Sequence, residues 1–125
     1  IMSESYHIGM FGEEFTAQRL QQRGYRIAAR NYHTPYGELD IIAVTQKYIV
    51  FVEVKTRRNT YMGPPEENVT PSKQKRLVRS ALFYLQHHPT ELQPRFDVAG
   101  VTVGPSNVVT GFHYLANAFE GKGLF

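Results

Sequence analysis

The sequence predicts an α/β fold in which a mixed β-sheet of about five strands is covered by helices on both faces. Two observations carry this prediction. First, two apolar runs rich in β-branched residues, 37–44 and 49–55, flank a short polar break, which is typical of a β-hairpin. Second, both runs are apolar on both of their faces, so we expect a helical layer on each side of the sheet.

The bulk properties limit the class of protein. The 125 residues suffice for one domain, 1–125, with a single core. No apolar run approaches the ~20 residues of a membrane span and no signal-peptide pattern opens the chain, so we expect a cytoplasmic protein without a membrane partner. The absence of cysteine excludes disulfides, thiolate catalysis and cysteine–zinc sites. A net charge of +3 permits a nucleic-acid partner.

The first predicted helix spans residues 5–23. Phe11, Phe15 and Leu20 recur at roughly helical spacing, and Gly24 suits the position after a helix C-terminus. A strand over 25–32 and the hairpin over 37–55 follow. The polar segment 56–68 after the hairpin is long for a loop, and loops of this length are usually functional or disordered.

The second predicted helix spans residues 70–87. Thr70 is a good N-cap and Pro71 suits the first helical position. Two strands, 96–103 and 108–115, and a short closing segment that begins at 117–119 complete the chain. Asp97 in the first of these strands is a candidate metal ligand, but we favour a structural pairing with an arginine or with the backbone.

Four charged side chains interrupt the apolar hairpin: Glu38, Asp40, Glu53 and Lys55. They need an explanation, because burying an unpaired charge is expensive. A two-residue turn at 46–47, or a four-residue loop over 45–48, places Asp40 opposite Glu53 and Glu38 opposite Lys55, so that all four share one face. A three-residue loop would shift the register by one residue and separate them.

The predicted arrangement suits a divalent cation. Two carboxylates ~5 Å apart repel by about 3 kcal/mol at an effective dielectric near 20, and a cation between them removes that cost. Carboxylate oxygens are the ligands that Mg²⁺ and Mn²⁺ prefer. Lys55 beside them could orient a water or stabilise charge that develops on a phosphate. A plain cross-strand ion pair between Glu38 and Lys55 is the alternative.

The same residues carry a resemblance to known families. Asp40, followed across the hairpin by Glu53-Val54-Lys55, resembles the Asp…Glu-x-Lys signature of the restriction-endonuclease-like, PD-(D/E)xK, nuclease superfamily, although Leu39 stands where that superfamily has proline. Along nearly the whole chain the sequence resembles the YraN-like family of small bacterial proteins, which is similar to archaeal Holliday-junction resolvases. The segments that carry this second resemblance are 9–14, 30–32, 37–42, 50–55, 95–98 and 117–119.

The resemblance implies a single nuclease-like domain with the restriction-endonuclease-like fold and a metal-dependent endonuclease activity on DNA, possibly branched or junction DNA. It implies that Asp40, Glu53 and the carbonyl of Val54 hold Mg²⁺ or Mn²⁺ and that Lys55 is catalytic. Similar nucleases carry a glutamate on the first helix that reaches the metal. Glu14 is the best match, and Glu13 competes with it. Because similar resolvases act as dimers, a homodimer is the expected assembly.

Basic residues next to this site are expected to hold a DNA backbone. Two of them open the polar segment after the hairpin, and four lie in the first half of the second helix. Two other classes of function stay open: a nucleic-acid-binding module that keeps the nuclease fold without cutting, and a protein–protein adaptor. The basic residues are Arg57, Arg58, Lys73, Lys75, Arg76 and Arg79.

Overall fold

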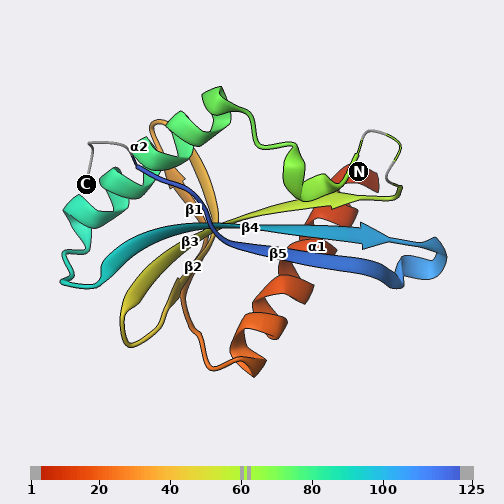
Figure 1. The fold of residues 1–125 in the computed structure, drawn as a ribbon, viewed down its shortest axis with the longest axis horizontal. Coiled ribbons are helices and arrows are strands. Elements are labelled where there is room, and N and C mark those ends of the chain that lie inside the picture. The colour runs from red at the N-terminus through yellow and green to blue at the C-terminus, as the bar shows by residue number, and fades with distance from the viewer. Residues whose placement is uncertain (1–3, 60, 62, 122–125) are drawn as a thin grey trace.

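The predicted α/β fold is confirmed by the computed structural model, which describes residues 4–59, 61 and 63–121 (Figure 1). Its five strands form one mixed sheet in the order in which they occur in the chain. The elements are α1 (Glu4–Gln22), β1 (Arg26–Thr34), β2 (Gly37–Val44), β3 (Tyr48–Arg57), the 3₁₀ turn η1 (Pro65–Glu67), α2 (Pro71–His87), β4 (Gln93–Val103), the 3₁₀ turn η2 (Pro105–Asn107) and β5 (Val109–Phe119).

The sheet is mixed, with one parallel pair of strands among antiparallel ones. Antiparallel pairs join β1 to β2, β2 to β3 and β4 to β5, whereas β3 and β4 run parallel. Parallel neighbours need a crossover connection, and α2 supplies it. The two helices lie on opposite sides of the sheet, as Figure 1 shows, so the expectation of helices on both faces is confirmed.

Each face of the sheet carries its own hydrophobic core. On one face, α2 packs through its buried stripe against one set of residues from β2, β3 and β4. On the other face, α1 packs through two buried residues against a second set from the same three strands. The α2 core contains Leu39, Ile42, Ile49, Phe51, Leu77, Val78, Ala81, Tyr84 and Phe96, and the α1 core contains Ala17, Leu20, Ile41, Ala43, Val50, Val52 and Ala99.

The last strand is longer than predicted. We expected a separate closing segment from 117 to 119, and this is wrong, because β5 continues without a break to Phe119. A register irregularity between Phe96 and Val98 absorbs the change in pairing, and Asn117 adopts a positive φ of 52° there. The rings of Phe96 and Phe119 then stack with centroids 5.0 Å apart, which holds the strand end onto the sheet.

Local features fix both helices where they approach the hairpin. The side chain of Thr70 accepts a hydrogen bond from the backbone N–H of Lys73 at 3.2 Å, so the predicted N-cap of α2 is confirmed. Gly12 lets α1 lie directly on β3, because a Cβ at this position would overlap the hydroxyl of Thr56. Within the described parts of the chain, no helix is long and apolar enough to cross a membrane.

Candidate functional site

The predicted hairpin register is confirmed. β2 pairs with β3 from Val44↔Ile49 to Ile41↔Val52, and the backbone N–H of Thr45 donates to the carbonyl of Tyr48 at 2.9 Å to close the turn. The backbone ladder ends at Ile41↔Val52, although both strands continue beyond that pair. The charged residues of the hairpin therefore lie where the two strands are no longer joined by their backbones.

Asp40 and Glu53 face one another at this point. The backbone N–H of Val54 donates to Oδ2 of Asp40 at 2.9 Å, so a side chain replaces the missing ladder bond. Burial raises the pKa of Asp40 to about 8, and the nearby charge of Glu53 adds to the rise. A hydrogen bond that only protonated Asp40 can donate to Glu53 acts in the same direction. The raised pKa means that, without a cation, Asp40 keeps its proton up to about pH 8.

Two lysines neutralise Glu53, whose residue surface is 5% exposed. Its Oε2 lies 3.7 Å from Nζ of Lys55 and 3.3 Å from Nζ of Lys73. Its Oε1 is buried and has no hydrogen-bond partner among the residues that the structure describes. Lys73 was predicted as a DNA contact from its place in the basic half of α2. The structure instead turns Lys73 inward to the acidic pair, which the sequence pattern of α2 alone did not indicate.

Glu14, the glutamate of the first helix that the sequence favoured, and its competitor Glu13 have different surroundings. Glu14 is exposed, pairs with Arg30 at 2.7 Å and accepts a hydrogen bond from Gln18 at 2.9 Å. These two hydrogen bonds hold the pKa of Glu14 below its ordinary value. No electrostatic influence of Asp40 or Glu53 on Glu14 accompanies them, so Glu14 lies to the side of the acidic pair.

Glu13 is the α1 carboxylate that senses the acidic pair. Burial raises its pKa first, the charge of Glu38 raises it further, and Glu53 contributes in the same sense. With its amide nitrogen turned toward the carboxylates, Asn31 donates to Oε1 of Glu13 at 2.8 Å and to Oε1 of Glu38 at 3.1 Å. Because neighbouring helical positions point about 100° apart, choosing between Glu13 and Glu14 required the exact rotation of α1.

The alternative ion pair between Glu38 and Lys55 gives way to other partners. The carboxylate of Glu38 lies 3.2 Å from Nδ1 of the exposed His33, whereas Lys55 turns to Glu53. The four hairpin charges therefore do not form one simple cross-strand pair. Asp40, Glu53 and Lys55 form a half-buried cluster, and Glu38 links it to Asn31 and Glu13 through the amide network.

Four of the remaining basic residues are exposed and one is engaged in the fold. Lys75, Arg76 and Arg79 are exposed on α2, and Arg57, which donates to the carbonyl of Thr56 at 3.0 Å, is exposed at the end of β3. The guanidinium of Arg58 is engaged inside the molecule. It donates to Oε1 of Glu4 at 2.8 Å and 3.0 Å, to the carbonyl of Gly104 at 2.9 Å and to Asn107 at 3.0 Å. Arg58 therefore fastens the start of α1 to the β4–β5 connection, and a phosphate would have to compete with these bonds.

The acidic pair offers part of a cation site. Among the residues that the structure describes, no three His, Cys, Asp or Glu side chains are arranged to hold a metal ion together. Mg²⁺, however, is commonly held by one or two carboxylates, with waters and substrate phosphates as the other ligands. The unpartnered, buried Oε1 of Glu53 and the raised pKa of Asp40 both fit a position that a cation would stabilise.

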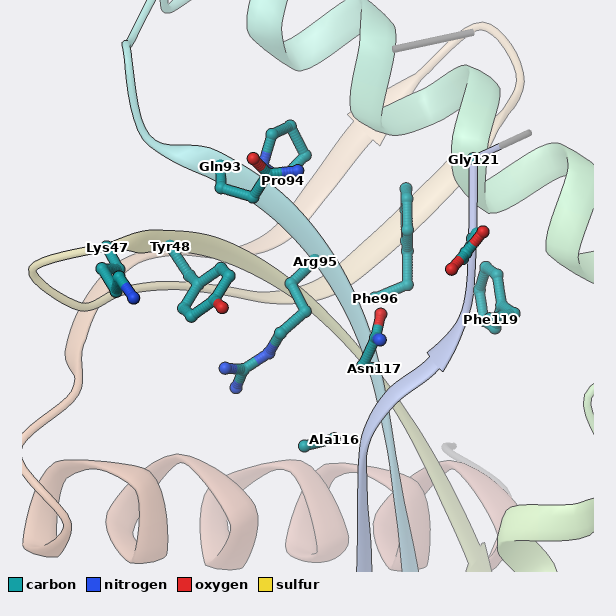
Figure 2. A pocket seen from close by; sticks show the side chains of 11 residues that line it. Lys47, Tyr48, Gln93, Pro94, Arg95, Phe96, Ala116, Asn117, Phe119 and Gly121 are labelled. Atoms are coloured by element: carbon teal, nitrogen blue, oxygen red, sulfur yellow. The ribbon is translucent and has the colours of Figure 1, made fainter. Parts of the chain in front are cut away.

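A second polar cluster lies on the α1 face of the sheet, where Asp97 of β4 pairs with Val52 of β3, and it is structural. Asp97 is fully buried and accepts hydrogen bonds from the guanidinium of Arg95, the hydroxyl of Tyr114 and the backbone N–H of Asn117. The preferred structural pairing of Asp97 is therefore confirmed. Figure 2 shows Arg95 at the edge of a cavity of about 800 Å³ between the start of β4 and the end of β5. The cavity is lined by Lys47, Tyr48, Gln93, Pro94, Arg95, Phe96, Ala116, Asn117, Phe119, Glu120 and Gly121.

Comparisons with known proteins give a consistent result. The model of the Uncharacterised protein family UPF0102 matches residues 12–101. The UPF0102 protein of Syntrophomonas wolfei is 45% identical over 115 residues, which cover 90% of this chain and 96% of that protein. The UPF0102 protein of Symbiobacterium thermophilum is 48% identical over 102 residues, which cover 81% of this chain and 86% of that protein. The UPF0102 protein of Dictyoglomus turgidum is 41% identical over 113 residues, which cover 90% of this chain and 96% of that protein. The resemblance to the YraN-like family is confirmed at this level.

Proposed function

This chain belongs to the UPF0102 family, and from that premise we propose that it is a metal-dependent nuclease that hydrolyses phosphodiester bonds of DNA. One observation carries the proposal: Asp40 and Glu53 converge where β2 and β3 part, with two lysines beside them. The repulsion between these two carboxylates is offset only by the two lysines and by the proton on Asp40. Such an arrangement favours binding of a cation. The resemblance of Asp40 and Glu53-Val54-Lys55 to the nuclease signature supports the same proposal.

The residues of the chain would divide the work as follows. Mg²⁺ or Mn²⁺ held by Asp40, Glu53 and the carbonyl of Val54 would supply positive charge that polarises the scissile phosphate. Asp40 must release its proton first, because carboxylates bind metals in the ionised form. The ammonium group of Lys55 would donate to the phosphate oxygen on which charge develops. Lys73 and Lys55 both contact Oε2 of Glu53. Lys73 would either position Lys55 through this shared carboxylate or donate to the phosphate itself.

The DNA backbone would lie along the outer face of α2. Lys75, Arg76 and Arg79 are exposed there, and Arg57 extends the basic surface from the end of β3. Contacts of this kind fix the position of a duplex without reading its sequence. Branched or junction DNA as the substrate, and a homodimer as the assembly, rest on the resemblance to resolvases.

A non-catalytic nucleic-acid-binding module is the second candidate. The observation that favours it is that Lys55 and Lys73 both approach Oε2 of Glu53. Two ammonium groups and the proton on Asp40 can together compensate the acidic pair without any cation. A protein of this kind would keep the basic face of α2 and bind DNA, but it would not cut.

A nuclease assay on branched, flapped and linear DNA with Mg²⁺ and with Mn²⁺ distinguishes these functions. We expect cutting by the wild-type protein, none by Asp40→Asn or Lys55→Ala, and unchanged cutting by Lys47→Ala. Lys47 is a matched control, since it is an exposed lysine in the β2–β3 turn, far from the acidic pair. Salt-dependent binding without cutting would select the binding module, and no binding at low salt would favour an adaptor.

The DNA-binding surface is tested separately. Each phosphate contact contributes about −0.9 to the slope of log K against log salt concentration. Replacing Lys75, Arg76 and Arg79 together with alanine should therefore reduce the magnitude of that slope by about 2 to 3 and weaken binding to all sequences alike. An unchanged slope in this triple variant would exclude the α2 surface from DNA binding.

A further inference from the structure

A second buried carboxylate lies outside the acidic pair. Glu66 in η1 has a side chain that is 7% exposed, and its Oε2 lies 3.0 Å from Nδ1 of His113 in β5. Its other oxygen, Oε1, is buried and has no hydrogen-bond partner in the described part of the chain. Gly100 makes room for this side chain, because a Cβ there would overlap Oε1 of Glu66. Burying a half-satisfied carboxylate is costly, so stability alone does not explain it.

The strand register places this carboxylate next to the proposed site. Lys55 of β3 pairs with Gly100 of β4, and Gly100 pairs with His113 of β5. Directly paired residues share a face of the sheet, so these three form one row across three strands. Glu66 covers Gly100 and therefore lies between Lys55 and His113. Both neighbours of His113 in β5, Phe112 and Tyr114, pack on the α1 side, which puts the row on the α2 side.

The ring of His113 is held in one orientation. Its side chain is 70% exposed, and Nδ1 points at the Glu66 carboxylate. An ionised carboxylate can only accept, so Nδ1 carries the proton in that bond. A histidine that donates one ring nitrogen to a carboxylate presents the other nitrogen, Nε2, away from that carboxylate. Here Nε2 faces outward on the face that carries Lys55.

We propose that His113, oriented by Glu66, is a further contact for the phosphodiester backbone of the DNA. In its charged form the imidazole donates Nε2–H to a phosphate oxygen, so the bound strand extends from Lys55 across β4 to β5. The proposal rests on the proposed function only in that the ligand is DNA. Glu66 touches the histidine and not the substrate, and it is therefore a positioning residue.

Few other charges face His113. On its own strand the same-face neighbours are Gly111 and Leu115, and on β4 they are Val98, Gly100 and Thr102. The charged groups on the packed elements are Glu66 and Glu67 of η1, Lys55 at the far end of the row, and Arg57 in the next row, which pairs with Thr102. Glu66 is the carboxylate in direct contact with the ring. Histidine side chains change charge between pH 5 and 8, so the test compares pH 6 with pH 8.

The first experiment measures the affinity for a fluorescent DNA duplex in EDTA, where no cutting occurs. Relative to the wild type, His113→Ala should bind about tenfold more weakly at pH 6, as expected for a hydrogen bond between charged groups. Its salt slope at pH 6 should be smaller in magnitude by about 0.9. At pH 8 the two proteins should differ little. His87→Ala is the matched control, because His87 is also exposed and also bonded through Nδ1, but at the far end of α2.

The second experiment separates positioning from structure. Glu66→Gln keeps an acceptor for Nδ1, so it should keep most of the DNA affinity, whereas Glu66→Ala frees the ring and should weaken binding about as much as His113→Ala. In the wild type, the NMR signals of the His113 ring should shift when duplex is added, a measurement that needs no variant. A merely structural Glu66 would change the melting temperature of both Glu66 variants and leave the DNA affinity of the folded proteins unchanged.

Three outcomes would overturn the inference: unchanged affinity of His113→Ala at both pH values, no shift of the His113 signals, or no duplex binding by the wild type at low salt. Binding without cutting has a different meaning. It would remove the proposed nuclease activity and leave the role of His113 intact.

Discussion

Two aspartates in this sheet have opposite surroundings. Asp97 accepts from Nε and Nη2 of Arg95 at 3.0 Å and 2.8 Å, from the hydroxyl of Tyr114 at 2.5 Å and from the backbone N–H of Asn117 at 2.8 Å. Asp40 accepts from one backbone N–H and faces the carboxylate of Glu53. Asp97 is fully buried and Asp40 is half-buried, but only Asp97 is supplied with a positive charge and several donors.

The difference shows that burial of a carboxylate does not by itself distinguish a structural role from a functional one. The charge of the groups around the carboxylate does distinguish them. The Asp97 cluster is complete: its hydrogen bonds raise the pKa of Arg95, and burial, followed by the charge of Asp97, raises the pKa of Tyr114. Each group there is held in the protonation state that the others need. At Asp40 the groups oppose one another, and a proton, a lysine or a cation must come between them.

Removing Asp97 should have the largest effect on stability. Asp97→Ala leaves the guanidinium of Arg95, whose side chain is 14% exposed, without its partner. Breaking a buried ion pair in this way costs about 3–5 kcal/mol. We expect the free energy of unfolding, measured by urea denaturation, to fall by that amount. A loss below about 1 kcal/mol would show that the cluster is not the structural anchor described here.

The pH dependence of stability should come next in size. The pKa of Asp40 rises from 3.8 to about 8 on folding, so the native protein holds a proton that the unfolded chain releases. This contribution is fully present below about pH 3.8 and is lost as the pH rises toward 8. In EDTA, stability should therefore fall by up to about 1.4 kcal/mol for each pH unit within that window.

Asp40→Asn isolates the part of this slope that belongs to Asp40. Because the amide does not titrate, the variant should lack that part of the slope and should be more stable than the wild type at pH 8, by a kcal/mol or more on the repulsion estimate used above. Urea denaturation of both proteins at pH 5 and pH 8 gives the comparison. Equal slopes in the two proteins would mean that Asp40 does not hold the proton.

Addition of Mg²⁺ should stabilise the wild type by a smaller amount. A ligand at ten times its Kd raises the free energy of unfolding by about 1.4 kcal/mol. The same addition should leave the melting temperature of Asp40→Asn unchanged, because one ligand is lost and an amide is a poorer one. A wild-type melting temperature that Mg²⁺ and Mn²⁺ both leave unchanged would favour the binding module.

The lysine variants should give the smallest shifts. Lys73→Ala and Lys55→Ala each remove a positive charge near Glu53, so each should leave Mg²⁺ affinity unchanged or raise it severalfold, by less than about 1.4 kcal/mol. Only Lys55→Ala is expected to abolish cutting. Calorimetric titration compares the affinities, and weaker binding in both variants would show that the lysines support the site instead of competing with the cation.

The sequence was sufficient for the fold and for the centre of the site. The apolar runs 37–44 and 49–55, with the short polar break between them, predict the hairpin, and a two- or four-residue connection gives the observed register that brings Asp40 to Glu53. The cap at Thr70 and Pro71 marks the start of α2 in the same local way. These features depend on a few adjacent residues, and such patterns can be recognised without knowledge of the tertiary structure.

The rest of the site depends on contacts between distant segments. Lys73 reaches Glu53 only because α2 docks with its first turn beside the end of β3. Glu13 lies within the influence of Glu38 and Glu53 because the close contact of Gly12 with Thr56 sets the rotation of α1. Arg58 is used internally because the start of α1 and the β4–β5 connection meet there. No local pattern of charge or spacing contains this information.

The single parallel pair, β3 with β4, gives the site an order of assembly. Both carboxylates and Lys55 lie in a local hairpin, whereas Lys73 lies in the crossover that must close before β4 can join the sheet. As the chain emerges from the ribosome, the hairpin is complete before α2 has been made. Lys55 comes from the hairpin itself, whereas Lys73 reaches Glu53 only once the crossover is in place, so the electrostatics of the hairpin depend on closure of the parallel half of the sheet.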